Sequence, residues 1–302
     1  MTALIETERL TKSYGANRGI VDLDLEVDEG EVFGFLGPNG AGKTTTIRTL
    51  LDHLRPTSGR ARIFGIETTA DPVAIHRRTG YLPGEFTLYD RLTGGQTIEY
   101  FGNLRGGVDP AYRASLIERL DLDPSRRFKE YSKGNEQKLG LVVAFQHRPE
   151  LLILDEPTSG LDPLVQQAFY GLVGEAQAEG RTVFLSSHVL SEVERTCDRV
   201  AIVRDGRLVR TGRVDTLRDL AHHQVELRFP DGVPTAEFAA LPGVSDVVVE
   251  DHILRLRVAG PITPVLQAAA RHELVDFLAR EPSLEETFLA EYGRQATEVS
   301  SR

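Results

Sequence analysis

A glycine-rich octapeptide behind an apolar run constrains the fold of this chain more than any other stretch. The run Val32–Leu36 is predicted to be a buried strand, and Gly37–Thr44 follows it with the spacing G-x-x-x-x-G-K-[ST]. Its glycines allow a tight curl in which several N–H groups point at one anion. A helix beginning near Gly42 would add the positive end of its dipole. The pattern therefore predicts an α/β fold with a phosphate-binding loop, and a nucleoside triphosphate as the ligand.

The loop side chains have separate expected roles. Lys43 is expected to place its positive charge on the β- and γ-phosphates, which also makes it a candidate catalytic residue, and the hydroxyl of Thr44 is expected to hold Mg²⁺. The residues expected to contact the nucleotide here are Gly37, Pro38, Asn39, Gly40, Ala41, Gly42, Lys43, Thr44 and Thr45.

Two carboxylates follow a second apolar run. Asp155 and Glu156 come directly after Leu151–Leu154, which is predicted to be a buried strand, and ligands of open α/β sheets bind at the carboxyl ends of strands. Asp155 is suited to holding Mg²⁺, and Glu156 is suited to polarising the water that attacks the γ-phosphate. Strands also end in acidic residues for solubility alone, but the phosphate loop favours the catalytic interpretation.

Composition narrows the class of protein. The 302 residues are enough for about two domains, and 40% hydrophobic with 26% charged residues is typical of soluble globular proteins. We see no apolar stretch near the roughly 20 residues that cross a bilayer, and no signal sequence at the N-terminus. Cys197 is the only cysteine, so no internal disulfide forms, and we expect it to be buried as a small apolar residue. The net charge of −10 argues against nucleic acid as a partner.

Hydrophobic periodicity predicts alternating strands and helices around the phosphate loop, as in an α/β core. The alternating stretch Val21–Val27 is expected to be a half-buried antiparallel strand, and Thr182–Leu185 a central parallel strand beside Leu151–Leu154. The other elements predicted in this part are a strand at Arg60–Gly65 and helices at Lys43–Leu54, Pro163–Gln177 and Leu190–Thr196, with a mainly helical region at about 86–150.

The last part of the chain is predicted to be a small α+β domain of the ferredoxin-like type, since its elements run in the order βαββαβ with one further helix. His222 and His223 are interpreted as linker residues rather than metal ligands. The predicted strands are Val225–Phe229, Val244–Glu250, Ile253–Val258 and Leu274–Leu278, and the predicted helices are Thr235–Leu241, Pro264–His272 and Leu284–Tyr292, the last with a capping box of Ser283 and Glu286.

Three further motifs, taken with the phosphate loop and the acidic pair, carry a family resemblance. Tyr131–Asn135 precedes a long helix, Ser159–Asp162 follows the acidic pair, and Leu185–His188 ends the next strand. In this order and spacing the chain closely resembles the ATP-binding subunits of ABC transporters over about Leu4 to Asp219. The resemblance implies a P-loop NTPase fold with an α/β core, an antiparallel β subdomain and a helical subdomain. The expected division is an ATP-binding domain at 1–221, an accessory domain at 222–295 and a tail at 296–302.

The resemblance also implies roles for single residues. Tyr14 matches the aromatic residue that stacks on adenine, and its alternative interpretation as a partly buried strand tyrosine is compatible with that role. Ser132 and Gly134 match the family signature, which meets the γ-phosphate bound by the opposite subunit. Asp162 matches the loop that crosses the dimer interface, and His188 matches the histidine that contacts the γ-phosphate. ATP and Mg²⁺ are the implied cofactors, and a second ATP-binding subunit is an implied partner.

Two positions depart from the family pattern. Where the family usually has a glutamine after Gly-Tyr-Leu-Pro, this chain has Gly84 and then Glu85, so Glu85 is a candidate replacement ligand for Mg²⁺. In the signature, Lys133 and Asn135 stand where glycine and glutamine are common. Lys133 either adds positive charge near the opposite γ-phosphate or points to solvent, and we favour the second.

The resemblance implies a peripheral protein on the cytoplasmic face of the membrane, held there by a separate permease. Phe86–Leu92 matches the place where the family docks a helix of the membrane subunit, although its apolar residues are equally suited to an internal core. Glu281–Leu289 resembles the tails of exporter subunits for drugs, antibiotics or lipids. The alternatives are a soluble ABC-type ATPase that acts on ribosomes or DNA, and a nucleotide-binding regulator without turnover.

Overall fold

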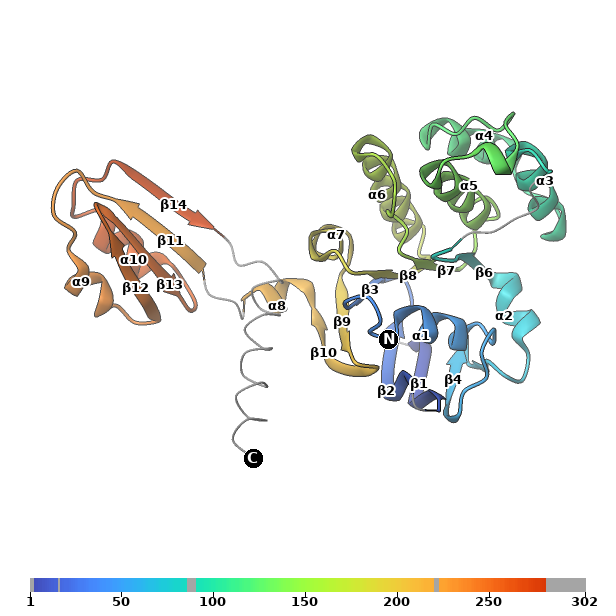
Figure 1. Cartoon of the computed structure of the whole chain (residues 1–302), viewed down its shortest axis with the longest axis horizontal. Coiled ribbons are helices and arrows are strands. Elements are labelled where there is room, and N and C mark those ends of the chain that lie inside the picture. The colour runs from blue at the N-terminus through green and yellow to red at the C-terminus, as the bar shows by residue number, and fades with distance from the viewer. Residues whose placement is uncertain (1–2, 16, 86–90, 220–222, 281–302) are drawn as a thin grey trace. The chain divides into compact units, whose positions relative to one another are not determined.

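The computed structural model describes residues 3–15, 17–85, 91–219 and 223–280 (Figure 1). The chain divides into two compact units, Met1–Thr211 and Gly212–Arg302, which are called unit 1 and unit 2 below. This division lies slightly before the boundary expected at residue 221, and the domain limits drawn from the sequence stay predictions.

The central layer of unit 1 is a six-stranded sheet with the order β10-β9-β3-β8-β7-β6. The pairs β6–β7, β7–β8, β8–β3 and β3–β9 are all parallel, so the strands on both sides of the phosphate loop end at one edge. The strands are β3 (Val32–Leu36), β6 (Thr79–Leu82), β7 (Leu151–Asp155), β8 (Thr182–Ser187), β9 (Arg199–Arg204) and β10 (Arg207–Arg213). The predicted central parallel strands are confirmed.

A second sheet of unit 1 is antiparallel, with the order β2-β1-β4-β5. The expected strand at Val21–Val27 is confirmed within β2, because Leu23 and Leu25 are buried whereas Asp22 and Asp24 are exposed. This alternation lets one face of the sheet join the core while the other meets water. The strands are β1 (Ala3–Tyr14), β2 (Asn17–Asp28), β4 (Ser58–Ile63) and β5 (Ile66–Glu67).

Helices α2 to α6 of unit 1 begin at short polar side chains that accept backbone N–H groups, whereas α1 and α7 have no side-chain cap. Asp109 and Asp162 cap helices whose next residue is proline, and Thr93 forms a capping box with Gln96. The helices are α1 (Lys43–Leu50), α2 (Pro72–Arg78), α3 (Gly94–Leu104), α4 (Pro110–Arg119), α5 (Lys133–Phe145), α6 (Pro163–Ala178) and α7 (Leu190–Thr196), with a 3₁₀ turn η1 at Phe128–Glu130. Helix α7 has the predicted bounds, and α6 extends one residue past its predicted end.

The predicted end of the helix after the phosphate loop was wrong. Helix α1 ends at Leu50 rather than at Leu54. Asp52 takes a left-handed backbone with φ 56°, and the N–H groups of His53 and Leu54 both donate to the carbonyl of Arg48 at 2.8 and 3.1 Å. This closing turn satisfies a carbonyl that a longer helix would have paired internally.

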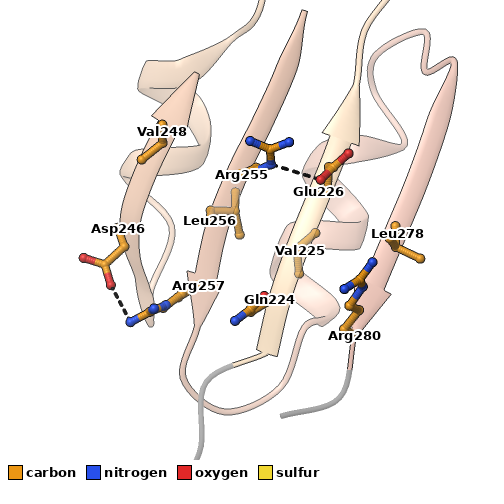
Figure 2. Close-up of a pocket in the computed structure, with 10 residues that line it drawn as sticks. All are labelled: Gln224, Val225, Glu226, Asp246, Val248, Arg255, Leu256, Arg257, Leu278 and Arg280. Carbon is orange, nitrogen blue, oxygen red and sulfur yellow. Dashed lines mark hydrogen bonds and ion pairs between the residues drawn. The ribbon is translucent and has the colours of Figure 1, made fainter. Parts of the chain in front are cut away.

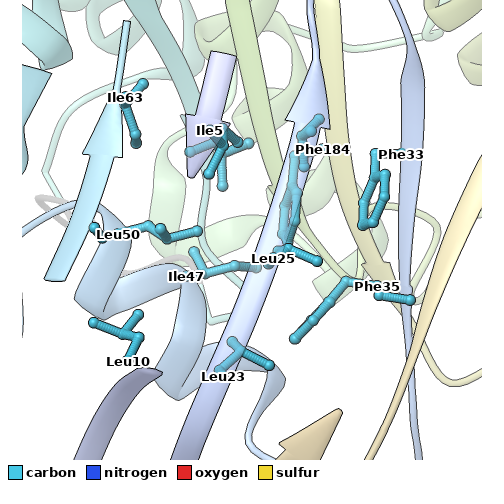
Figure 3. Packing of buried hydrophobic residues seen from close by; sticks show 14 of the residues in the cluster. Ile5, Leu10, Leu23, Leu25, Phe33, Phe35, Ile47, Leu50, Ile63 and Phe184 are labelled. Carbon is cyan, nitrogen blue, oxygen red and sulfur yellow. The ribbon is translucent and has the colours of Figure 1, made fainter. Parts of the chain in front are cut away.

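The core of unit 1 lies between the two sheets and contains α1 (Figure 3). Phe184 of β8 packs against Phe33 and Phe35 of β3, with ring centroids 5.9 and 5.5 Å apart. Ile47 and Leu50 bring α1 into the same cluster. On the other face of the six-stranded sheet, α6 packs on β8 and α7 packs on β3 (Figure 1). The strand that precedes the phosphate loop is therefore packed on both faces.

The single cysteine lies inside this packing. Cys197 is buried, and burial raises the pKa of its thiol well above the ordinary range. A Cβ placed on Gly34 of β3 would come within 3.0 Å of its Sγ. Its predicted place as a small buried apolar residue is confirmed.

Unit 2 is built on a four-stranded sheet with the order β12-β13-β11-β14, in which all neighbours are antiparallel. Helices α9 and α10 each connect two strands that are separated by one other strand, which is the split βαβ arrangement predicted for a ferredoxin-like unit. The elements are α8 (Val214–Asp219), β11 (His223–Arg228), α9 (Thr235–Ala239), β12 (Val244–Glu250), β13 (Ile253–Val258), α10 (Thr263–Ala269) and β14 (Asp276–Arg280). Strand β14 begins two residues later than predicted, and the predicted helix Leu284–Tyr292 with its capping box lies outside the described residues.

The two faces of this sheet differ in chemistry. Phe238 and Val265 of the helices bury one face together with Leu227 and Leu254. The other face carries cross-strand ion pairs (Figure 2): Arg255 Nε lies 3.0 Å from Glu226 Oε2, and Arg257 Nη1 lies 3.2 Å from Asp246 Oδ2. These pairs lie in a hollow of about 400 Å³ that also includes the exposed side chains of Val248 and Leu278.

No helix in the part of the chain that the structure describes is long and apolar enough to cross a membrane.

A half-buried histidine, His147, is expected to make the stability of unit 1 depend on pH. His147 follows α5, and burial, with a further effect from the charge of Arg105, lowers the pKa of its imidazole to about 4. The two residues meet near Thr79, whose carbonyl accepts Nη2 of Arg105 at 3.1 Å. The folded chain therefore holds this imidazole neutral at pH values where the unfolded chain protonates it.

Because the pKa is lowered on folding, we expect stability to be lost as the pH falls from about 6.5 towards 4, by at most about 1.4 kcal/mol per pH unit. Urea unfolding of the wild type and of His147→Gln between pH 4 and 7 measures this difference. The variant should show a shallower pH dependence, and identical slopes for the two proteins would contradict the prediction.

Candidate functional site

The phosphate loop connects β3 to α1. Gly42 has φ 103°, and a Cβ there would lie 2.9 Å from Cγ2 of Ile20, so only glycine fits this position without strain. No side chain caps the start of α1, and the N–H groups of its first turn remain available for an anion. The backbone therefore has the form expected of an anion-binding loop.

Lys43 lies at the centre of the site and is only 6% exposed. Its ammonium Nζ donates to the carbonyls of Gly37 at 2.6 Å and Pro38 at 3.3 Å, and it lies 3.1 Å from Oε1 of Glu156. The side chain thus connects the loop after β3 to the carboxylate that follows β7.

Asp155, at the end of β7, is fully buried and accepts two hydroxyl groups. Thr44 Oγ1 donates to its Oδ2 at 2.7 Å, and Ser186 Oγ donates to its Oδ1 at 2.5 Å. Nearby, burial and then the Asp155 carboxylate raise the pKa of Tyr81 to about 12. Asp155 therefore lies in a closed polar pocket beside the phosphate loop.

The hydroxyl oxygen of Thr44 and Oδ2 of Asp155 lie 2.7 Å apart, and both are hard donors of the kind that Mg²⁺ prefers. Among the described residues, no group of three or more His, Cys, Asp or Glu side chains is arranged to hold a metal. Mg²⁺ usually takes one or two protein ligands together with substrate phosphates, so this donor set fits a metal that arrives with a nucleotide.

Glu156 has a strained backbone and a tightly held carboxylate. Its φ is 51°, which is uncommon for a residue other than glycine, and its N–H donates to the carbonyl and hydroxyl of Ser186 at 3.2 and 3.1 Å. Gln137 of α5 donates to its carbonyl at 3.0 Å. Oε2 of Glu156 lies 2.7 Å from Nδ1 of His188, a side chain that is 48% exposed. Lys43, Glu156 and His188 thus form one connected row.

The signature residues lie at the start of α5. The hydroxyl of Ser132 accepts the N–H of Asn135 at 3.3 Å and caps the helix. A Cβ on Gly134 would come within 2.6 Å of the carbonyl of Gly160, so this position must be glycine for the two segments to touch. Asp162 caps α6 by accepting two N–H groups at 3.1 Å. The signature and the loop before α6 are therefore packed as one piece.

Tyr14, Lys133 and Glu85 lie at the surface. Tyr14, at the end of β1, is 43% exposed, and Lys12 Nζ lies 5.5 Å from its ring centroid. Lys133 is exposed in the single chain, which both interpretations of its role allow. Glu85 is also exposed, and its place in a metal site stays a prediction. Of the predicted docking segment, residues 86–90 lie outside the described residues.

The structure brings the phosphate loop, the acidic pair and His188 together, and it joins Ser132, Gly134 and Asp162 into a second cluster. Two contacts of the site are not predicted from the sequence: the hydroxyl of Ser186 donates to Asp155, and the side-chain amide of Gln137 donates to the carbonyl of Glu156. In the sequence, Ser186 belongs to a strand end and Gln137 to a predicted helix. A polar residue in the last positions of a central strand was the available signal for Ser186.

We expect Ser186→Ala to lower the free energy of unfolding by about 1–3 kcal/mol, because it leaves a buried carboxylate oxygen without its donor. Urea unfolding measures the loss. The control is Ser191→Ala, since Ser191 is exposed on α7. Equal stability of the two variants would show that the Ser186 hydroxyl does not support Asp155.

The chain resembles known proteins over most of its length. A family model described as ABC transporter matches residues 20–159. The bacitracin transport ATP-binding protein BcrA of Enterococcus faecalis is 35% identical over 260 residues, with 85% of this chain and 84% of the relative covered. The daunorubicin/doxorubicin resistance ATP-binding protein DrrA of Streptomyces peucetius is 34% identical over 317 residues, with coverage of 99% and 96%. A solved ATP-binding subunit of an ABC transporter superposes with a TM-score of 0.66 at 33% identity, over 71% of this chain and 92% of that one.

Proposed function

The chain belongs to the ABC transporter family of ATP-binding proteins, and we propose that it is the ATPase subunit of an exporter, driving a separate membrane permease. The observation that carries the proposal is the row Lys43–Glu156–His188, which joins the phosphate loop to a water-activating carboxylate and a γ-phosphate contact. The relatives are named for bacitracin transport and for daunorubicin and doxorubicin resistance, which supports efflux of a drug, an antibiotic or a lipid.

The row also supplies a way to couple nucleotide binding to chemistry. The γ-phosphate of ATP competes with Glu156 for the ammonium of Lys43, because both are anions within reach of one cation. Once Lys43 turns to the phosphate, Glu156 is left with His188 and is free to orient a water molecule. Thr44 and Asp155 would hold Mg²⁺, which neutralises charge on the phosphate oxygens. Tyr14 would stack on adenine from the exposed end of β1.

The second cluster is proposed to act on a nucleotide held by another copy of the chain. Ser132 and Gly134 lie at the N-terminal end of α5, where helix N–H groups favour an anion, and Asp162 lies beside them. The side chains of Ser132 and Asp162 accept hydrogen bonds at the starts of their own helices rather than from the phosphate loop. We therefore assign them to a head-to-tail dimer in which two ATP molecules are sandwiched, with homodimer as the simplest form.

The permease is proposed to hold the dimer at the cytoplasmic face of the membrane. The alternative, an ABC-type ATPase that works on ribosomes or DNA without a permease, is disfavoured by the names of the relatives and by the net charge of −10. Unit 2 is proposed to regulate or stabilise the dimer. The DrrA match supports a place for unit 2 in efflux subunits, because it extends over 99% of this chain.

We expect Glu156→Gln to bind ATP and to accumulate as a dimer, because the amide no longer activates water while the phosphate contacts remain. Analytical ultracentrifugation with Mg²⁺ and ATP measures the association, and phosphate release measures turnover. Turnover should fall at least about 100-fold. The matched control is Lys43→Ala, which should lose both ATP binding and dimerisation. Turnover at the wild-type rate in Glu156→Gln would show that Glu156 does not activate the attacking water.

Removal of residues 222–302, which leaves α8 but takes away the four-stranded sheet of unit 2, tests the role proposed for this unit. We expect the shortened chain to bind ATP, since the whole phosphate loop remains, but to dimerise more weakly or to hydrolyse ATP at an altered rate. The same centrifugation and phosphate assays measure both properties, with transport measured in cells that carry the permease. Unchanged dimerisation, turnover and transport would reject a regulatory or stabilising role.

A further inference from the structure

We propose that Glu192 is a positioning residue that holds the two catalytic segments of the site in one fixed arrangement. This inference rests on the proposed function, because it concerns the rate of ATP hydrolysis. Glu192 lies in α7, and its carboxylate accepts the hydroxyl of Thr158 at 2.6 Å on Oε1 and the hydroxyl of Ser187 at 2.8 Å on Oε2. One side chain thus bridges the loop after β7 and the end of β8.

The two hydroxyl groups lie next to the residues that carry the chemistry. Thr158 is two residues after Glu156, and Ser187 directly precedes His188. Thr158 is 5% exposed and Ser187 is fully buried, so neither hydroxyl finds water in place of Glu192. Because a carboxylate accepts on both oxygens and donates on neither, it satisfies both hydroxyls at once. A displacement of Glu192 would move both segments.

Ser187 also connects the residues on either side of His188. Its hydroxyl oxygen also accepts the N–H of Val189 at 2.9 Å, so His188 lies between two anchored residues. Helix α7 is itself tied to α6, since Arg195 Nη2 donates to Gln167 Oε1 at 2.7 Å. The 2.7 Å contact between Glu156 and His188 is therefore flanked on the His188 side by residues that are hydrogen-bonded to one another.

The loop that contains Thr158 continues to Asp162, which is proposed to face the second copy. Backbone bonds tighten this loop, because Ser159 N–H donates to the carbonyl of Glu156 at 3.1 Å and Leu161 N–H donates to that of Thr158 at 3.1 Å. A shift at the dimer interface would therefore reach Glu156 and, through Glu192, His188. Glu192 makes none of its hydrogen bonds with the phosphate loop, so its effect should fall on kcat rather than on ATP affinity.

The test compares Glu192→Gln and Thr158→Val, which keep side-chain shape but remove the carboxylate or the hydroxyl. Thr158→Ser keeps the hydroxyl and is the conservative rescue, and Ser191→Ala is the control on the same helix. ATP affinity is measured with a fluorescent ATP analogue without Mg²⁺, and kcat and KM by phosphate release. Thermal unfolding confirms that each variant is folded.

We expect kcat to fall about tenfold or more in Glu192→Gln and Thr158→Val, because misplacement of catalytic groups by about 1 Å costs up to about 100-fold. ATP affinity should stay within about twofold of wild type. Thr158→Ser and Ser191→Ala should hydrolyse at the wild-type rate. The double variant Glu192→Gln/Thr158→Val should be no slower than Glu192→Gln alone, since both remove the same bridge.

Wild-type kcat in Thr158→Val would overturn the inference, and so would losses that multiply in the double variant. A fall in ATP affinity as large as the fall in kcat would also overturn it, because a general loss of structure affects both. Failure of the proposed function looks different: the wild-type chain then does not hydrolyse ATP. Failure of this inference leaves wild-type hydrolysis intact and unaffected by Thr158→Val.

Discussion

The parallel pairing of β3, β8 and β7 is the constraint on which the site depends. Leu36 pairs with Ser187, and Asp155 pairs with Ser186, so three strands end side by side at one edge of the sheet. Each strand is followed by a segment with different chemistry: a phosphate loop, an acidic pair and a histidine. Residues far apart in the chain thereby reach hydrogen-bond distance, and the ring of Phe184 on β8 packs against Phe33 and Phe35 on β3.

The charge interactions at this edge of the sheet centre on the ammonium of Lys43. The ammonium of Lys43 lies between loop carbonyls and the carboxylate of Glu156, whose other oxygen meets His188. A single buried cation shared in this way responds strongly to a new anion, because charge interactions are screened less away from water. In the proposed function, nucleotide recognition and activation of water both follow from this contact. The signature cluster, packed against the loop before α6, is proposed to meet the nucleotide of a second copy.

The sequence allowed part of this to be predicted. The phosphate loop, β3 and α7 were found because glycine spacing and hydrophobic periodicity are local properties. The end of α1 was not predicted correctly, since the turn at Asp52 depends on the hydrogen bonds that the N–H groups of His53 and Leu54 make to the carbonyl of Arg48. The bridge through Glu192 and the support from Ser186 and Gln137 depend on contacts between distant segments, which no local pattern encodes. The roles of Tyr14, Ser132, Gly134, Asp162 and His188 came from family resemblance and stay proposals.

The central claim is that two copies of this chain close on shared ATP. Cysteine cross-linking tests it most directly, since Cys197 is buried and the positions of Asn39 and Lys133 are exposed. In a protein carrying Asn39→Cys and Lys133→Cys, we expect a covalent dimer that forms with ATP and does not form without it. Cross-links confined to single chains, or a dimer yield that is the same with and without ATP, would contradict closure of two copies on ATP.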